Sequence, residues 1–189
     1  SIFSQNSIHK ADVVGVPEVW SFERQKSQTG TIAGRTVKRY GDDFYMLTPD
    51  FEVYAWPRDV FITRDSSQKN KRINFSINPY RAHLACAEIV NNRYYYIAFE
   101  SGHAADSLVY EMWVYDIFSD RWFGPHVGYD IASMFYDKDT NYLLCGGSGT
   151  DLQGFVMEHR GLDIKNKISK IHWISSYSDF GQPRIDKRY

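Results

Sequence analysis

The sequence predicts an all-β protein, on three observations. Fourteen Tyr, twelve Phe and five Trp make up 16% of its 189 residues, and aromatic side chains fit the half-buried face of a β-sheet. Helical periodicity is nearly absent along the chain. Apolar runs separated by short turns rich in Asp, Asn and Gly recur instead, which is the pattern of antiparallel strands.

The expected strands fall into three groups. In the first group a turn at residues 41–43 separates two strands, because Gly and Asp tolerate the backbone angles of a hairpin. Each later group repeats the order of apolar strand, polar turn, very apolar strand, loop and outer strand. The strands are expected at 35–40, 44–49 and 51–56; at 83–90, 94–100 and 108–117; and at 129–137, 141–147 and 155–161, with a last one at 167–177.

The groups repeat at a regular spacing. Their second strands begin at Phe44, Tyr94 and Tyr142, about 50 residues apart, and such a period with about four strands per unit is typical of β-propeller blades. We therefore predict β-propeller blades, each an antiparallel four-stranded sheet. In this interpretation Trp113 and Trp122 flank a hairpin and fill the space between neighbouring sheets.

One group resembles a kelch repeat. "VYDIFSDRW" (114–122) supplies a Tyr-Asp strand, a turn and a Trp, and "YLLCGG" (142–147) supplies the strand that ends in Gly-Gly. The other groups lack the glycine pair, so the similarity covers a single blade.

Charge and composition exclude several classes of function. The net charge of −1 gives no basic excess for stable nucleic-acid binding. No run approaches the ~20 apolar residues of a membrane span, so we expect no membrane insertion. Cys86 and Cys145 lie in apolar runs; buried free thiols are the favoured interpretation, and a disulfide stays open.

Catalytic and metal-binding patterns were sought and not found. "DKDTN" (137–141) begins like a calcium loop but has Tyr142 and Ser148 where that loop needs Gly and Glu. A carboxylate pair of the glycosidase kind would have to come from Glu100, Asp106 and Glu111, whose spacing does not single them out. The histidines show no ligand spacing. We expect no enzyme, no cofactor and no metal; the histidines are His9, His83, His103, His126, His159 and His172.

Two longer stretches are similar to the propeller-type structural proteins of tailed phages, the nozzle and head-completion (stopper-like) proteins of short-tailed phages. The first stretch runs over residues 30–56 and the second from Trp113 to the end of the chain. The matching positions are Gly30, Ala33, Thr36, Val37, Phe44, Tyr45, Met46 and Leu47, then Val114, Tyr115, Asp116 and Trp122, and last Ser178, Asp179, Phe180, Gly181, Pro183, Lys187 and Arg188.

This resemblance implies a structural role in the virion. Subunits of that family form a ring, usually of six, at the portal–tail channel through which DNA passes, and they contact other tail and adaptor proteins. It implies blades over residues 1–178 and an exit segment over 179–189 that leads toward a further domain. We also expect further blades beyond these residues, since an unclosed propeller would expose sheet edges.

The ring contacts are expected from outer-strand aromatic and charged residues, with packing between sheets as the alternative for each. Two other functions remain open, namely a cellular kelch-like propeller that acts as a protein-interaction platform and a carbohydrate-active propeller. The interface candidates are Trp20, Phe22, Trp56, Tyr110, Trp113, Tyr115 and Arg121.

Overall fold

A computed structural model describes residues 1–15, 20–63, 76–102, 109–127, 131–147 and 156–158. Fourteen strands and two short 3-10 helices are described, and the strands form small antiparallel sheets of three or four strands. The all-β prediction is confirmed. Within these residues no helix is long and apolar enough to cross a membrane.

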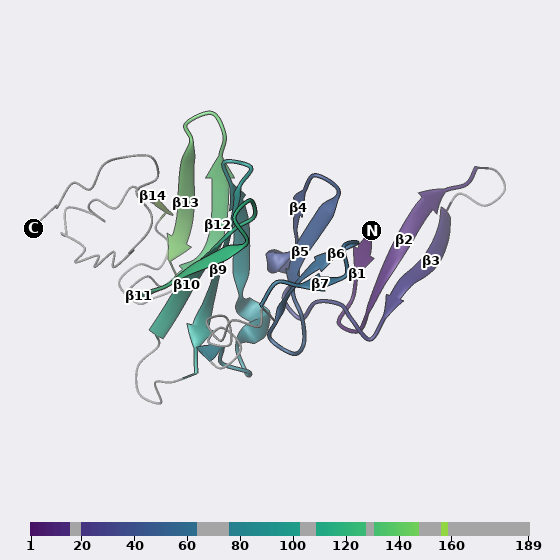
Figure 1. Cartoon of the computed structure of the whole chain (residues 1–189), viewed down its shortest axis with the longest axis horizontal. Helices are drawn as coiled ribbons and strands as arrows, with labels where there is room; N and C mark the ends of the chain where they lie inside the picture. Colours follow the sequence, from purple (N-terminus) through teal and green to yellow (C-terminus); the bar gives the residue numbers. More distant parts are fainter. Residues whose placement is uncertain (16–19, 64–75, 103–108, 128–130, 148–155, 159–189) are drawn as a thin grey trace, which may run out of the picture.

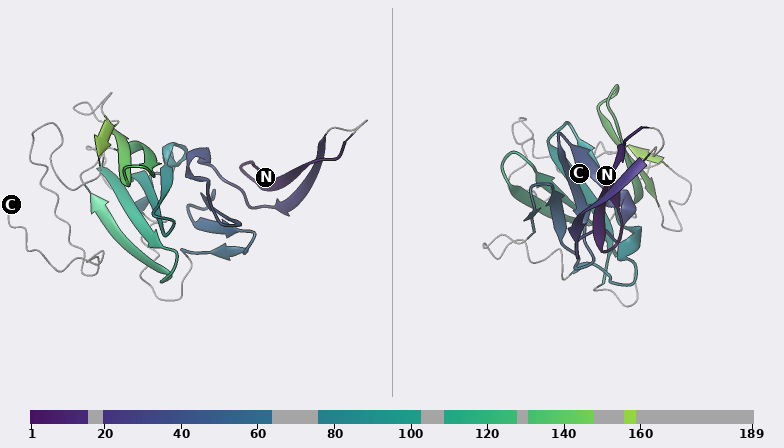
Figure 2. Two further views of the ribbon diagram at one scale, coloured as in Figure 1. Left: turned by 90° about the horizontal axis from the view of Figure 1, so that it is seen from above. Right: turned by 90° about the vertical axis from the view of Figure 1, so that its right-hand side faces the viewer.

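The N-terminal sheet consists of β1 (Ile2–Phe3), β2 (Ser7–Val13) and β3 (Trp20–Ser27) in the order β1-β2-β3. Strands β2 and β3 extend away from the rest of the molecule as a hairpin (Figures 1 and 2). We call residues 9–15 and 20–25 of this hairpin the arm.

Three further sheets follow the N-terminal one, and we number them first, second and third. The first sheet contains β4 (Lys38–Tyr40), β5 (Asp43–Leu47), β6 (Val53–Trp56) and β7 (Val60–Phe61), and the 3-10 helix η1 (Gly34–Thr36) precedes it. Its strands are hydrogen-bonded in chain order. Such an up-and-down arrangement requires only short connections between neighbouring strands.

The second sheet repeats this plan at larger size. The 3-10 helix η2 (Ala82–Leu84) precedes β8 (Cys86–Val90), β9 (Tyr94–Ser101), β10 (Val109–Asp116) and β11 (Arg121–Val127). The strands again lie in chain order. The third sheet has β12 (Ile131–Asp137), β13 (Tyr142–Gly147) and β14 (Val156–Glu158) in the same order.

Most expected strands lie within a few residues of observed ones. The starts expected at 35 and 83 fall in η1 and η2 instead. Strands β7 and β11 and the whole N-terminal sheet were not predicted. The expected strand at 167–177 and the exit segment at 179–189 lie outside the described residues.

Two hydrophobic clusters hold the three sheets in a stack. Between the first and second sheets, Tyr45 and Leu47 meet Tyr95 and Phe99, and the Tyr45 and Tyr95 rings are 5.5 Å apart. Between the second and third sheets lies a second cluster, which contains Cys86, Tyr96, Met112, Ile131, Leu143 and Cys145. Because the second sheet is covered on both faces, nearly every side chain of β9 is buried.

A third cluster covers the outer face of the first sheet. Phe3 and Ile8, from the root of the N-terminal hairpin, pack against Phe44 and Trp56. The Phe3 ring lies 5.2 Å from Phe44 and 6.3 Å from Trp56. The hairpin root therefore occupies the place that a neighbouring sheet occupies elsewhere in the stack.

The first strands of the three sheets lie side by side. Lys38 on β4 pairs with Glu88 on β8 at 3.0 Å. The guanidinium of Arg35, in η1, donates to the carbonyl of Leu84 at 3.2 Å and to that of Ala132 on β12 at 2.9 Å. One arginine thus joins the starts of all three sheets.

Candidate interaction surface

Three hairpins of the stack are closed by the same kind of side-chain hydrogen bond. In each, a Tyr hydroxyl donates to the Asp or Asn side chain five residues later, in Tyr54–Asp59 and Tyr115–Asp120 at 2.6 Å and in Tyr136–Asn141. The acceptor residue has a positive φ in all three, at 59°, 52° and 62°. Asp and Asn tolerate this left-handed region better than other residues with side chains, so the spacing of five residues identifies these turns.

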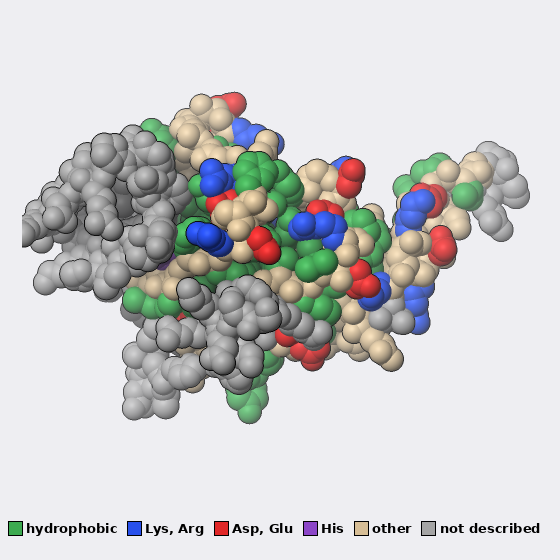
Figure 3. Space-filling view, in the orientation of Figure 1, with side chains coloured by type: hydrophobic (Ala, Val, Ile, Leu, Met, Phe, Trp, Pro, Cys, Tyr) green, Lys and Arg blue, Asp and Glu red, His purple; other side chains and the backbone are tan. Residues whose placement is uncertain are grey.

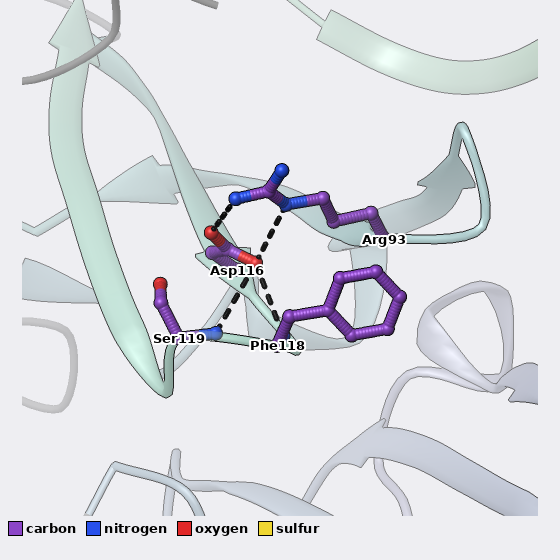
Figure 4. A network of polar contacts seen from close by, with 4 residues as sticks. All are labelled: Arg93, Asp116, Phe118 and Ser119. Atoms are coloured by element: carbon purple, nitrogen blue, oxygen red, sulfur yellow. Dashed lines mark hydrogen bonds and ion pairs between the residues drawn. The ribbon is translucent and has the colours of Figure 1, made fainter.

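Asp116 organises the turn between β10 and β11. Its carboxylate accepts two hydrogen bonds from the Arg93 guanidinium, at 3.0 and 2.7 Å, and one from the backbone N–H of Phe118 at 3.0 Å (Figure 4). The Arg93 guanidinium also lies 4.9 Å from the centroid of the Tyr94 ring. Asp116 is the aspartate of the kelch-like Tyr-Asp pair, and here it fastens one hairpin to the next.

The charge on Asp116 is strongly favoured. Hydrogen bonds from Arg93, Ser119 and Phe118 hold the pKa of this carboxyl at about 2, against 3.8 ordinarily. The carboxylate is buried while Arg93 is partly exposed. The group is therefore ionised at neutral pH and has a structural role at this turn.

Trp113, Trp122 and Tyr115 fill the space between the first and second sheets. Trp113 is 4% exposed and Tyr115 3%, and both belong to the cluster between these sheets. The Trp122 indole N–H donates to the carbonyl of Ile62 at 3.0 Å. The interpretation of Trp113 and Trp122 as rings between neighbouring sheets is confirmed, and burial leaves Trp113 and Tyr115 no surface for a partner.

The other stack residues expected at an interface are in mixed positions. Trp56 is half-buried against Phe3 and Phe44. Tyr110 is half-buried on β10, where it pairs with Glu100 on β9. Arg121, at the start of β11, is exposed.

The arm carries several of the exposed large apolar side chains among the described residues. Trp20 is 55% exposed and Phe22 63%. Cross-strand pairing places Val13 opposite Trp20 and Ala11 opposite Phe22, and alternation along each strand puts all four on one face. Lys10 and Asp12 form an ion pair of 2.9 Å on the other face. We call Ala11, Val13, Trp20 and Phe22 the apolar arm face.

Figure 3 shows hydrophobic side chains near the outer end of the arm and charged ones along it. Trp20 and Phe22 were predicted to lie at an interface, whereas Val13, which is 68% exposed, was not. The signal that identifies Val13 is its position in an alternating pattern opposite Trp20, which is only readable once the hairpin register is known.

The carboxylates considered for glycoside chemistry are engaged in local contacts. Glu100 forms an ion pair with Arg81 at 2.9 Å and accepts from the Asn78 amide at 3.3 Å. Glu111 accepts from the Trp113 indole at 3.1 Å. Asp106 lies outside the described residues. The described residues contain no group of three or more His, Cys, Asp or Glu that could hold a metal ion.

Cys86 and Cys145 are buried free thiols of the cluster between the second and third sheets. Burial raises the pKa of each thiol to about 12. A thiol with so high a pKa is a poor nucleophile at neutral pH, so neither cysteine is a candidate reactive group.

No protein-family model matches this chain, and no curated protein matches it. The similarity to phage propeller proteins therefore stays a prediction from short motifs.

Proposed function

We propose that this chain is a structural subunit of a tailed-phage virion, one copy of a ring, expected to have six subunits, at the portal–tail channel. Its partners are identical subunits and the neighbouring tail or adaptor proteins, and DNA passes through the ring without being bound stably. The observation that carries the proposal is a stack of sheets packed through buried side chains, from which an arm with exposed aromatic residues projects. Exposed aromatic residues on a projecting arm are suited to contact with another subunit.

The stack supports the proposal through its order. The three sheets follow chain order, their first strands lie side by side, and aromatic rings fill the spaces between their faces. This is the relation that blades of a β-propeller have to one another around their axis. We therefore propose that the small sheets are blades of a β-propeller, and that further blades close the propeller.

The arm supports a role in assembly. Soluble monomeric proteins rarely expose a contiguous apolar patch larger than a few hundred Å², and larger patches mark interaction sites. The arm presents Val13, Trp20 and Phe22 on one face, each more than half exposed. Trp and Phe are enriched at the cores of protein interfaces, and Trp is among the residues that most often dominate their energetics.

The residues of the phage resemblance fall at structural positions. Gly30 is closely surrounded, because a Cβ there would lie 1.9 Å from the carbonyl oxygen of Ser4. Thr36 donates to the Ala33 carbonyl at 2.7 Å and accepts from the Leu47 N–H at 3.0 Å. These contacts join the chain leaving the arm to the first sheet, so the motif has a physical reason to persist in a family with this architecture.

A kelch-like interaction platform is the second candidate. The Asp116 network around the Tyr-Asp pair favours it, although such a network also stabilises any propeller hairpin. The two functions differ in assembly, because a platform binds a different protein as a monomer. We do not propose a carbohydrate-active site, because Glu100 forms an ion pair with Arg81 and Glu111 accepts a hydrogen bond from the Trp113 indole.

The test is the assembly state of the chain. We expect light scattering and negative-stain microscopy to show closed rings at micromolar concentration. A protein that stays monomeric up to about 100 μM, in the range of weak affinities, contradicts the ring. A monomer that captures one different protein through the arm favours the platform.

A further inference from the structure

The arm is a hairpin of only two strands along most of its length. Strand β1 pairs with β2 at Ile8 and His9, so beyond His9 the described part of the arm consists of β2 and β3 alone. The arm projects from the stack (Figures 1 and 2), and the side chains of residues 20–25 are all exposed. An isolated two-stranded hairpin is at best marginally stable in water. A further strand beside the arm would therefore stabilise it.

Strand β3 offers an edge for such a strand. It is the outer strand of the N-terminal sheet, its eight residues include no proline or glycine, and the register shift of the hairpin falls between Arg24 and Lys26. The outer strands of the first and second sheets are different, because β7 has two residues and β11 contains Pro125. Short strands and prolines protect sheet edges against pairing. The edge of β3 from Trp20 to Arg24 lacks both protections.

The sequence of β3 fits a second copy of itself. When two copies of a strand pair antiparallel around a two-fold axis, one residue lies opposite itself. With Phe22 at that position, the two Phe22 rings pair across the strands. Trp20 then lies opposite Arg24 of the second copy, and Ser21 opposite Glu23. Aromatic pairs and a guanidinium beside an indole ring are both favourable across strands.

The other registers are less favourable. Pairing centred on Glu23 places two glutamates opposite each other, and pairing centred on Arg24 places two arginines there. Like charges directly opposite are destabilising. Pairing centred on Ser21 joins only three described residues of β3 to the second copy. The charges on this edge thus select the register centred on Phe22.

This register also keeps the two faces of the arm distinct. A two-fold axis perpendicular to the sheet leaves each face on its own side. The apolar arm faces of both copies therefore form one apolar side of a four-stranded sheet, and the Lys10–Asp12 ion pairs lie on the other side. We infer that β3 of one copy pairs edge to edge with β3 of a second copy, antiparallel and centred on Phe22.

The inference goes beyond the proposed ring. A contact in which both copies use the same surface joins two subunits and does not by itself close a ring of six. The arm contact is therefore additional to the contacts between ring neighbours. It links copies in pairs, for example one ring to another.

Cross-linking on the polar face tests the pairing directly. A chain with Ser21→Cys is mixed with a chain with Glu23→Cys under mild oxidation, and a covalent dimer is expected because these positions lie opposite each other. Both side chains are exposed and lie outside the apolar arm face. Each variant alone should give little dimer, because identical positions are then about 7–8 Å apart on the diagonal, beyond the usual reach of a disulfide.

The matched control for the edge is Asp12→Cys mixed with Glu23→Cys. Asp12 lies on the same polar face as Glu23 but on β2, away from the paired edge, so no dimer is expected. The wild-type chain gives the background, which should be low because Cys86 and Cys145 are buried. Self-linking of the Ser21→Cys chain or of the Glu23→Cys chain in excess of the mixture would overturn the register.

Self-association separates edge pairing from packing of the two apolar faces. Phe22→Lys places two cations at the two-fold axis and is expected to weaken pairing at least about 10-fold. The matched control is Val13→Lys, which is on the same face and similarly exposed, at 68% against 63% for Phe22. Because Val13 is on β2, we expect a change below about 3-fold. Equal weakening by the two changes would show face-to-face packing and overturn the inference. Sedimentation velocity measures both, with circular dichroism as the check of folding.

The outcomes distinguish the arm contact from the ring. Rings that form without the cross-link between positions 21 and 23 overturn the arm contact and leave the ring standing. Dimers that cross-link at these positions but form no ring support the arm contact and contradict the ring. A wild-type chain that stays monomeric up to about 100 μM overturns both.

Discussion

The stack and the arm use the same antiparallel hairpins but bury their aromatic side chains to opposite extents. On β9, Tyr95 and Phe99 are at most 1% exposed, whereas on β3 Trp20 and Phe22 are 55% and 63% exposed. In the stack, the first and third sheets cover the two faces of the second sheet. The arm has left the stack, so its apolar face has no cover from the described residues of its own chain. The alternation of apolar and polar side chains along a strand thus produces an apolar face. That face is buried only where a neighbouring sheet packs on it.

The largest effect is expected from removing an aromatic ring in the stack. Phe99→Ala should lower the free energy of unfolding by about 3–5 kcal/mol, because the ring is lost and a cavity remains between two sheets. Urea denaturation at low protein concentration measures this. A loss below about 1 kcal/mol would mean that the first and second sheets are not packed as described.

Asp116→Asn should cost about 1–3 kcal/mol at pH 7, because the buried ion pair with Arg93 loses its negative partner. Arg93 is partly exposed, which keeps the effect toward the lower end. Urea denaturation at a series of pH values measures the free energy of unfolding of both chains.

The pH dependence follows from the lowered pKa of Asp116. A carboxyl that titrates at about 2 when folded and near 3.8 when unfolded stabilises the folded state above pH ~4. This contribution is lost as the pH falls from about 4 to about 2, so the difference between wild type and Asp116→Asn should narrow there. A difference that stays constant over this range would contradict the role of the carboxylate.

A smaller effect is expected for the ion pair between first strands. Lys38→Gln should cost about 0.5–1 kcal/mol, because Lys38 and Glu88 are both largely shielded from solvent. The matched control is Arg39→Gln, whose partner Asp42 is fully exposed at 3.8 Å; we expect no measurable change from it. Double-mutant cycles with Glu88→Gln and Asp42→Asn separate the pair energies.

The smallest effect on folding is expected in the arm. Phe22→Ser should change the free energy of unfolding of the monomer by no more than about 0.5 kcal/mol, as for an exposed residue. The same denaturation measurement at low concentration checks it. A cost above about 2 kcal/mol would show that the arm packs against its own chain, and the comparison with the stack would fail.

The stack was largely predictable from the sequence because its signals are local. Very apolar strands such as β9 and β13, together with Asn, Asp and Gly turns, mark the hairpins within a few residues. Packing of Trp113 and Trp122 between sheets followed from their position at a turn. Strand boundaries at η1 and η2 were missed, because a short 3-10 turn has no periodicity of its own to recognise.

Strands β7 and β11 could not be predicted for different reasons. Strand β7 is only two residues long, and β11 contains Gly124 and Pro125, which argue against a strand. Gly124 has a φ of 134°, and a Cβ there would lie 3.1 Å from the Trp113 ring. At the edge of a sheet, a proline with no N–H to donate is tolerated, and edges are not marked in a sequence.

The interaction surface was the least predictable feature. Seven aromatic and charged residues were expected at interfaces because they were assigned to outer strands, and two of these, Trp113 and Tyr115, are buried within the chain. Alternation reveals that a strand has two faces but does not reveal which face a neighbouring sheet covers. Val13 was missed for the same reason, since its exposure depends on contacts between segments far apart in the sequence.

The turns closed by a tyrosine and an aspartate or asparagine five residues later bear on how such a protein can change over time. Each one is closed by a side-chain hydrogen bond within six consecutive residues. A hairpin whose turn is closed by its own side-chain hydrogen bond can be duplicated, lost or transferred as a unit. The number of hairpins in such a protein can therefore vary, while the conformation of the turn in each hairpin stays the same.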